Sequence, residues 1–128
     1  MEARVTHEQI FTTNAPQPAG GYSQAIRLGN LVWTAGFGPQ DPVSGAVAES
    51  VAEQTRQVLR NVAATLEAAG LELSDVVKTT VHLADLADFA EFNTAYEEFF
   101  SNPKPARTTV GSQLAGIRVE IDVVAGRW

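Results

Sequence analysis

Residues 50–83 read SVAEQTRQVLRNVAATLEAAGLELSDVVKTTVHL, a strong helix signal followed by a strong strand signal. Ser50 and Glu53 match the capping-box pattern, in which side chains and backbone donors of the first helical turn satisfy one another. Gly70 is suited to the left-handed conformation that ends many helices. Between these limits, apolar positions at spacings of three and four form one stripe: Val51, Thr55, Val58, Val62, Leu66 and Ala69. The stretch predicts an amphipathic helix and then a β-rich strand at 76–83.

Two short strands are predicted before this helix, at 23–28 and 31–34. Gly29 and Asn30 separate them, and both residues tolerate the positive φ of a primed hairpin turn. A weaker strand signal surrounds Ile10-Phe11. The N-terminal part of the chain therefore predicts a hairpin beside one further strand.

After residue 83 the pattern changes back to a helical period and then to strands. A second helix is predicted from Asp85 or Asp88 to Phe100, with an aromatic stripe formed by Phe89, Phe92, Tyr96 and Phe99. Two final strands are predicted at about 107–112 and 117–124. The order β-β-β-α-β-α-β-β indicates an α+β fold, a mixed β-sheet of about six strands with two helices packed on one face.

Composition excludes several classes of protein. The 128 residues are expected to form a single domain, 1–128, with a hydrophobic core large enough to be stable without disulfides or a bound metal. The absence of cysteine excludes disulfides, thiol nucleophiles and thiolate metal sites. A net charge of −6, with nine scattered Lys and Arg residues, disfavours nucleic-acid partners. No signal peptide and no membrane-spanning run is predicted, so we expect a cytoplasmic protein.

Arg107 is the most informative single residue. It follows the proline-studded turn 102–106 and opens a predicted strand, so rigid backbone would hold its planar guanidinium, which suits a carboxylate or phosphate. A surface position or a simple ion pair explains it as well. Glu120 and Asp122 lie on one side of the last strand, where a solvated face, a subunit interface and catalysis are all consistent with the pattern.

Asn93 and Tyr22 are further candidates. Asn93 lies on the aromatic stripe, where its amide needs hydrogen-bond partners, and it could pin a loop or line a pocket. Tyr22 follows two glycines and could be a pocket wall or ordinary loop packing. Ser23 and Ser112 have no evident histidine partner, which disfavours a serine nucleophile. Two distant histidines without an acid at ligand spacing predict no metal site.

An ordered series of short motifs resembles the reactive-intermediate deaminase family, the Rid or YjgF-like proteins. The resemblance runs from residue 14 to residue 127. Its strongest parts are Gly21-Tyr22-Ser23-Gln24-Ala25, Leu28-Gly29-Asn30-Leu31, Pro42-Val43-Ser44-Gly45, Asn61-Val62, Ala68-Ala69-Gly70-Leu71, Asp75-Val76-Val77-Lys78-Thr79-Thr80-Val81, Asp88-Phe89-Ala90-Glu91-Phe92-Asn93, Pro105-Ala106-Arg107 and Val119-Glu120-Ile121.

This resemblance implies a chorismate-mutase-like fold and a homotrimer with ligand pockets between subunits. It also implies hydrolysis of enamines and imines, such as 2-aminoacrylate, 2-iminopropanoate and 2-iminobutanoate, to 2-keto acids and ammonia, without a metal or organic cofactor. Arg107 would bind the substrate carboxylate and Glu120 would position the attacking water. Tyr22 and Asn93 would line the pocket together with the backbone around Gly36.

Several positions depart from the better-studied family members. Thr109 stands where a cysteine is common, Phe37 replaces a frequent glutamine, Ala35 a frequent serine and Gly21 a frequent proline, and the segment 101–104 is shorter. Phe37 and Thr109 belong to the implied substrate-binding set. These departures leave the physiological substrate open more than the reaction class.

Two other functions fit the same residues. One is a pathway-specific deaminase or hydrolase of a larger relative, such as a carbamoylated aminoacrylate, which the change at Phe37 and the short 101–104 segment favour. The other is a non-catalytic protein that binds small carboxylates, since an arginine pocket suffices for binding. RNA cleavage, attributed to some relatives, is disfavoured by the acidic charge and the lack of a histidine pair.

Overall fold

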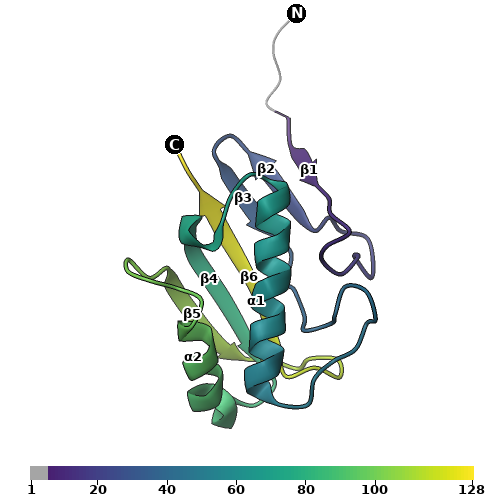
Figure 1. The fold of residues 1–128 in the computed structure, drawn as a ribbon, viewed down its shortest axis with the longest axis vertical. Coiled ribbons are helices and arrows are strands. Elements are labelled where there is room, and N and C mark those ends of the chain that lie inside the picture. The colour runs from purple at the N-terminus through teal and green to yellow at the C-terminus, as the bar shows by residue number, and fades with distance from the viewer. Residues whose placement is uncertain (1–5) are drawn as a thin grey trace, which may run out of the picture.

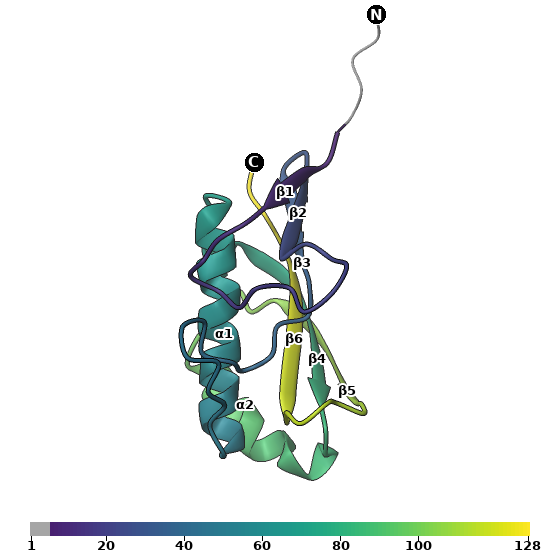
Figure 2. The ribbon, with the colours of Figure 1, turned by 90° about the vertical axis from the view of Figure 1, so that its right-hand side faces the viewer.

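One mixed six-stranded sheet, with strand order β1-β2-β3-β6-β4-β5, carries both helices on a single face (Figures 1 and 2). The computed structural model describes residues 6–128. The elements are β1 Glu8–Ile10, β2 Ala25–Leu28, β3 Leu31–Thr34, α1 Val51–Ala68, η1 Leu73–Asp75, β4 Val76–Leu83, η2 Leu86–Asp88, α2 Phe89–Glu97, β5 Ala106–Gly111 and β6 Val119–Gly126. The predicted order and α+β class are confirmed.

The predicted hairpin joins β2 and β3, with Leu28 opposite Leu31 and Ala25 opposite Thr34. Gly29 has a φ of 61°, whereas no residue other than glycine has a positive φ among the described residues. Asn30 therefore does not use the conformation expected of it. A positive φ at the first central position alone is the requirement of a type II′ turn.

Helix α1 begins and ends where the sequence predicts. Ser50 Oγ accepts a hydrogen bond of 3.0 Å from the backbone N–H of Glu53, which satisfies one of the unpaired donors of the first turn. At the other end Gly70 has a φ of 77°, and Leu71 N–H donates to Leu66 O over 2.9 Å. This is the Schellman arrangement, which satisfies carbonyls that the helix itself leaves open.

Helix α2 is shorter than predicted and ends at Glu97 instead of Phe100. Phe92 and Tyr96 are buried, and the Tyr96 ring lies between the rings of Phe92 and Phe100, with centroid distances of 5.3 and 4.7 Å. Phe100 thus continues the aromatic stack beyond the regular helix. The strands β5 and β6 also begin one residue earlier and two residues later than predicted, respectively.

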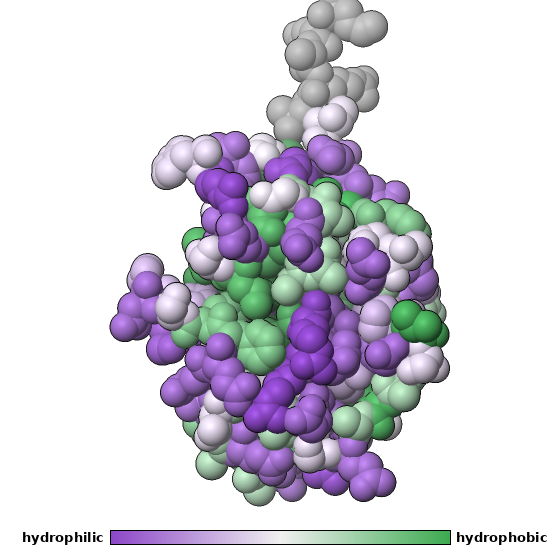
Figure 3. Space-filling model, viewed as in Figure 1, coloured by the Kyte–Doolittle hydropathy of each residue, from purple (hydrophilic) through white to green (hydrophobic). Residues whose placement is uncertain are grey.

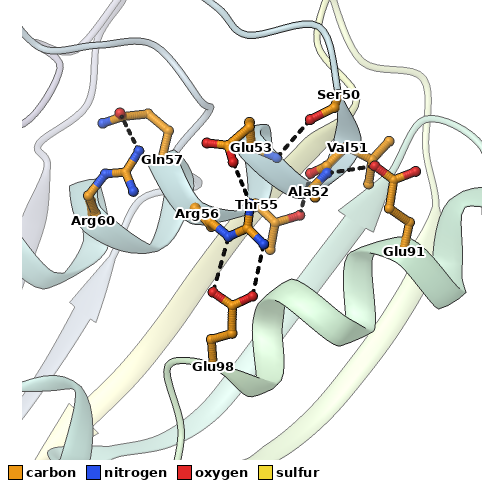
Figure 4. A network of polar contacts seen from close by, with 10 residues as sticks. All are labelled: Ser50, Val51, Ala52, Glu53, Thr55, Arg56, Gln57, Arg60, Glu91 and Glu98. Atoms are coloured by element: carbon orange, nitrogen blue, oxygen red, sulfur yellow. Dashed lines mark hydrogen bonds and ion pairs between the residues drawn. The ribbon is translucent and has the colours of Figure 1, made fainter.

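Polar contacts join the two helices on their outer side (Figure 4). Arg56 on α1 donates to both carboxylate oxygens of Glu98 and also contacts Glu53. Glu91 on α2 accepts from the backbone N–H of Ala52 over 3.0 Å, so α2 supplies a second cap to the start of α1. Strongly hydrophilic residues lie over the centre and lower part of this face, below a hydrophobic area (Figure 3).

The hydrophobic core lies between the helices and the inner sheet face. Its largest fully buried members include Val58, Leu59, Val62 and Leu66 of α1, Phe92 of α2, and Val81, Leu83, Val119 and Ile121 of the sheet. No helix of residues 6–128 covers the opposite sheet face (Figure 2). Within the same range, no helix has the length and apolar character needed to cross a membrane.

Candidate functional site

Arg107 lies on the helix-covered face of the edge strand β5. It pairs with the buried Thr79 of the parallel strand β4. The Thr79 hydroxyl lies 2.9 Å from the Tyr96 hydroxyl. The guanidinium carbon lies 4.8 Å from the centroid of the Tyr96 ring, 5.4 Å from that of Phe89 and 5.8 Å from that of Phe92. Each cation–π contact is worth about 0.5–2 kcal/mol, so the aromatic stripe of α2 holds the cation in place.

Asn93 is the polar partner of this cation. Arg107 Nη1 donates to Asn93 Oδ1 over 2.8 Å, and Asn93 Nδ2 donates to Glu97 Oε1 over 2.9 Å. A guanidinium has five N–H groups. Within residues 6–128, the only hydrogen bond that the Arg107 side chain donates goes to Asn93. The remaining N–H donors lie in one plane, so two of them can donate to the two oxygens of a carboxylate at once.

We call the space beside this guanidinium the arginine cavity. It has a volume of about 280 Å³ and is lined by Asn93, Tyr96, Glu97, Lys104, Pro105 and Arg107. Lys104 adds a second cation, and its ammonium also donates to the carbonyl of Phe100 over 2.8 Å. A small cavity walled by two cations and a single acid is suited to a small anionic molecule.

Glu120 lies on β6 and projects from the other face of the sheet. It pairs with His82, while its neighbours Val119 and Ile121 are fully buried on the helix side. Its carboxylate packs over Gly36, because a Cβ atom added there would lie 2.6 Å from Glu120 Oε2. Only glycine leaves room for the acid at this point.

A second space, the glutamate cavity, surrounds this carboxylate. It has a volume of about 400 Å³ and is lined by Pro16, Gln17, Ala19, Tyr22, Gln24, Gly36, Phe37, Gly38, Gln40, Ala115, Ile117 and Glu120. Two buried amides fix its loops. Gln24 donates to the carbonyls of Thr12 and Pro16, and Asn61 donates to those of Gly38 and Gln40.

The other predicted pocket residues fall differently. Tyr22 lines the glutamate cavity, is 51% exposed, and its hydroxyl accepts from the N–H of Ala19 over 3.1 Å. Phe37 touches the same cavity, but its side chain is only 5% exposed and belongs to the core, where its backbone bridges to Ile121. Thr109 on β5 pairs with Val81 on β4 and is among the lining residues of neither cavity.

The two cavities share no lining residue. Arg107 and Glu120 leave opposite sheet faces, and the strand β4 separates β5 from β6. Neighbouring strands lie about 4.8 Å apart, which puts the two backbones roughly 10 Å from each other before the side chains diverge. Within one chain, therefore, the predicted carboxylate anchor and the predicted water-binding acid do not face a common space.

The expectation that Ser112 lacks a histidine partner is wrong. Ser112 Oγ lies 2.8 Å from His82 Nδ1, because Ser112 directly follows β5 and His82 lies on the adjoining β4. Asp122 Oδ2 is 3.8 Å from His82 Nε2, a separation too long for a hydrogen bond. Burial raises the pKa of the Asp122 carboxyl, against the lowering influence of His82 and Lys78. The three groups are not assembled as a catalytic triad.

Glu97, Lys104, Gln24 and Asn61 also contribute to the cavities without having been predicted. Glu97 stands four residues after Asn93 on the same helix, a spacing that could have indicated the contact. The roles of the two buried amides depend on loops distant in sequence, and no local pattern signals them. Among residues 6–128, His, Asp and Glu side chains form no group of three that could hold a metal ion.

Comparison with known proteins gives consistent matches over nearly the whole chain. A family model described as endoribonuclease L-PSP matches residues 12–126. A RutC family protein of Pyrococcus horikoshii is 50% identical over 121 residues, which cover 92% of this chain and 96% of that protein. The 2-iminobutanoate/2-iminopropanoate deaminase of Salmonella typhimurium is 47% identical over 123 residues, 92% of this chain and 96% of that enzyme. The crystal structure of the YjgF gene product of E. coli matches with a TM-score of 0.90 and 44% identity, covering 94% of this chain and 99% of that one.

Proposed function

The chain belongs to the endoribonuclease L-PSP family, which includes the YjgF, RutC and Rid proteins, and we propose that it is a hydrolytic deaminase of small 2-imino acids. Its substrates would be reactive enamines and imines such as 2-aminoacrylate, 2-iminopropanoate and 2-iminobutanoate. The products would be the corresponding 2-keto acids and ammonia. The family and a deaminase relative at 47% identity support the reaction class.

The observation that carries this proposal is the guanidinium of Arg107. Three aromatic rings and Asn93 hold it at the wall of the arginine cavity, and only one of its hydrogen bonds is made within the described residues. A 2-imino acid carries a carboxylate directly beside the electrophilic C=N carbon. Anchoring the carboxylate on two N–H groups would therefore also orient the carbon that water attacks.

Glu120 would supply the proton chemistry. Its carboxylate would accept a hydrogen bond from a water molecule, take one proton as the oxygen bonds to the C=N carbon, and pass that proton to the nitrogen to give the carbinolamine. The carboxylate would then take the hydroxyl proton of the carbinolamine and deliver it to the nitrogen, as the C=O bond forms, the C–N bond breaks and ammonia leaves. One imine and one water would give one keto acid and one ammonia. No electron transfer is involved.

We further propose that each complete site lies between two subunits of a homotrimer. Because Arg107 and Glu120 project from opposite faces of one sheet, a single chain offers them to different spaces. A neighbouring copy could place its glutamate cavity against the arginine cavity of the first. The exposed edge of β5, beside Arg107, supports this arrangement because an unpaired sheet edge is a natural place for a partner.

Burial of Phe37 supports simple substrates over a carbamoylated one. In the sequence, the change at this position favours a pathway-specific enzyme, together with the short 101–104 segment. The ring of Phe37 belongs to the core, however, and is only 5% exposed. The substitution therefore changes packing behind the glutamate cavity more than the volume open to a ligand.

A non-catalytic carboxylate-binding protein is the second candidate. The separation of Arg107 from Glu120 within one chain favours it, since binding needs only the arginine cavity. Endoribonuclease activity, named in the description of the family model, has less support. A net charge of −6 opposes attraction of a phosphate backbone.

The decisive experiment follows 2-iminopropanoate and 2-iminobutanoate generated in place by an amino-acid oxidase, with semicarbazide as a competing trap. The protein should accelerate loss of the imine and reduce semicarbazone formation. Arg107→Ala should lower kcat/KM by about 100-fold or more, because two charge-assisted hydrogen bonds are lost. Glu120→Gln should lower kcat by about 100-fold while binding of pyruvate is retained.

Absence of any acceleration by the purified protein would contradict deaminase activity. If pyruvate still bound in an Arg107-dependent way, the carboxylate-binding alternative would be correct. Full turnover in Arg107→Ala would exclude a non-catalytic protein and would contradict the role of Arg107 as the carboxylate anchor of the deaminase. Turnover of a carbamoylated aminoacrylate well above that of both simple imines would restore the pathway-specific alternative.

A further inference from the structure

Glu97 is the one acidic side chain in the wall of the arginine cavity. It is the last residue of α2, one helical turn after Asn93. Its Oε1 accepts the 2.9 Å hydrogen bond from Asn93 Nδ2, and Asn93 Oδ1 accepts the 2.8 Å bond from Arg107. Acid, amide and guanidinium thus form a linear hydrogen-bonded series that ends at the proposed carboxylate anchor.

The series has a chemical direction. A carboxylate only accepts hydrogen bonds, a guanidinium only donates them, and an amide does both through different atoms. Glu97 therefore fixes the NH₂ group of Asn93 on its own side, which turns the carbonyl oxygen toward Arg107. With the amide reversed, two donors would face each other at the guanidinium, and a donor would be left without an acceptor.

Glu97 contacts the anchor only through Asn93. No ion pair within 4.0 Å links Glu97 to Arg107 or to Lys104 in the described residues, although all three line the same cavity. A direct neutralising role is therefore not built into the cavity. The contact seen is the hydrogen bond to Asn93.

We propose that Glu97 is a positioning residue for substrate binding. It holds the Asn93 amide in the orientation that binds one N–H of Arg107, so that the other N–H groups are directed to the substrate carboxylate. This role rests on the proposed deaminase function. It differs from the helix-stabilising effect of an i, i+4 pair, which is worth only about 0.2–0.5 kcal/mol and would not alter substrate affinity.

The test compares Glu97→Leu with Glu97→Gln. The leucine variant removes the acceptor, and we expect KM for 2-iminopropanoate and Kd for pyruvate to rise about two- to tenfold, the value of one hydrogen bond, with kcat changed less. Glutamine keeps a carbonyl oxygen that can accept from Asn93, so Glu97→Gln should recover most of the affinity. The exposed Glu67 on α1 provides a matched control, and Glu67→Leu should leave both constants unchanged.

A double-mutant cycle makes the test specific. Glu97→Leu should add little to the loss caused by Asn93→Leu, since both act on the same contact. Additive losses, or a Glu97→Gln variant as weak as Glu97→Leu, would overturn the proposal in favour of a simple charge effect. Unchanged affinity in Glu97→Leu would overturn it as well. If the wild-type protein fails to accelerate imine hydrolysis, the deaminase function fails, and pyruvate binding still tests the positioning role.

Discussion

Gly36 is where a single methyl group would reach the proposed catalytic acid. In Gly36→Ala the new Cβ would lie 2.6 Å from Glu120 Oε2, so the carboxylate must move. The obstacle is the end of a flexible side chain, and Gly36 does not have a positive φ. We therefore expect little change in Tm but a fall in kcat of about tenfold or more, since small displacements of a catalytic group are costly.

Gly21→Ala is the matched control for this change. A Cβ at Gly21 meets nothing within 4 Å, although the residue also borders the loop that carries Tyr22. This variant should keep both its melting temperature and its imine turnover. A Gly36→Ala protein with full activity would show that the position of the Glu120 carboxylate does not matter for the reaction.

Asp122 makes stability depend on pH in an unusual direction. Burial raises its pKa in the folded protein, so the folded state favours the protonated acid. The stability that the protonated Asp122 carboxyl contributes to the folded state is fully present below the ordinary pKa of about 3.9. It is lost as pH rises through the higher folded-state pKa. Asp122→Asn cannot ionise, so its stability relative to the wild type should increase as pH rises above about 4.

Urea unfolding between pH 4 and pH 8 measures this difference. Asp41 provides the opposite case, because backbone N–H groups of Ser44 and Val43 lower the pKa of its carboxyl. The stability that the ionised Asp41 carboxyl contributes is lost only as pH falls through that lowered pKa. The difference in unfolding free energy between Asp41→Asn and the wild type should therefore stay constant above about pH 4. A flat or reversed trend for Asp122→Asn would contradict the assigned cause of the shift.

The start of α1 depends on Ser50. Its hydroxyl accepts from Glu53 N–H, whereas the Glu53 carboxylate contacts Arg56 and completes no capping box. Ser50→Ala should destabilise the protein by about 1 kcal/mol, seen as a lower urea midpoint with an unchanged m value. The exposed Ser101→Ala should not shift the midpoint. An equal effect of both substitutions would argue against a capping role.

Local patterns explain which elements could be predicted. The Ser50 cap, the apolar stripe and the Gly70 stop all act within a few residues, and they predicted α1 to within a residue or two. The parallel pairing of β4 with β5 could not be predicted in this way, because it joins segments about 30 residues apart. That pairing sets Arg107 opposite Thr79 and Ser112 beside His82, which is why the latter contact was missed.

The same limit applies to the candidate site. Arg107 and Asn93 were each singled out from the sequence, but their contact follows from the packing of α2 on β5. The family resemblance implies that Phe37 lines the pocket, and Phe37 does border the glutamate cavity, yet its ring fills the core. Whether a side chain lines a cavity or fills a core depends on the layer that covers it, which a local pattern does not contain.

The molecule as a whole has one covered and one uncovered sheet face. On the uncovered side Trp33 is 41% exposed, and polar side chains of β4 and β6, among them His82 and Asp122, share this sheet face. Partly apolar surface of this kind is typical of an interaction site. Together with the unpaired edge of β5, it provides two surfaces through which the proposed trimer could form.

Mixed trimers test whether each site takes Arg107 from one subunit and Glu120 from the next. Arg107→Ala and Glu120→Gln chains, each inactive alone, are co-expressed with different affinity tags, and assemblies carrying both tags are purified. A mixed cyclic trimer contains the two variants in a 2:1 or a 1:2 ratio, and in both cases one interface of three joins an intact arginine to an intact glutamate. Activity should therefore return to about a third of the wild-type rate. Two differently tagged Arg107→Ala chains form the control and should stay inactive. Inactive mixed assemblies would contradict a site shared between subunits, because every such trimer contains one complete pair.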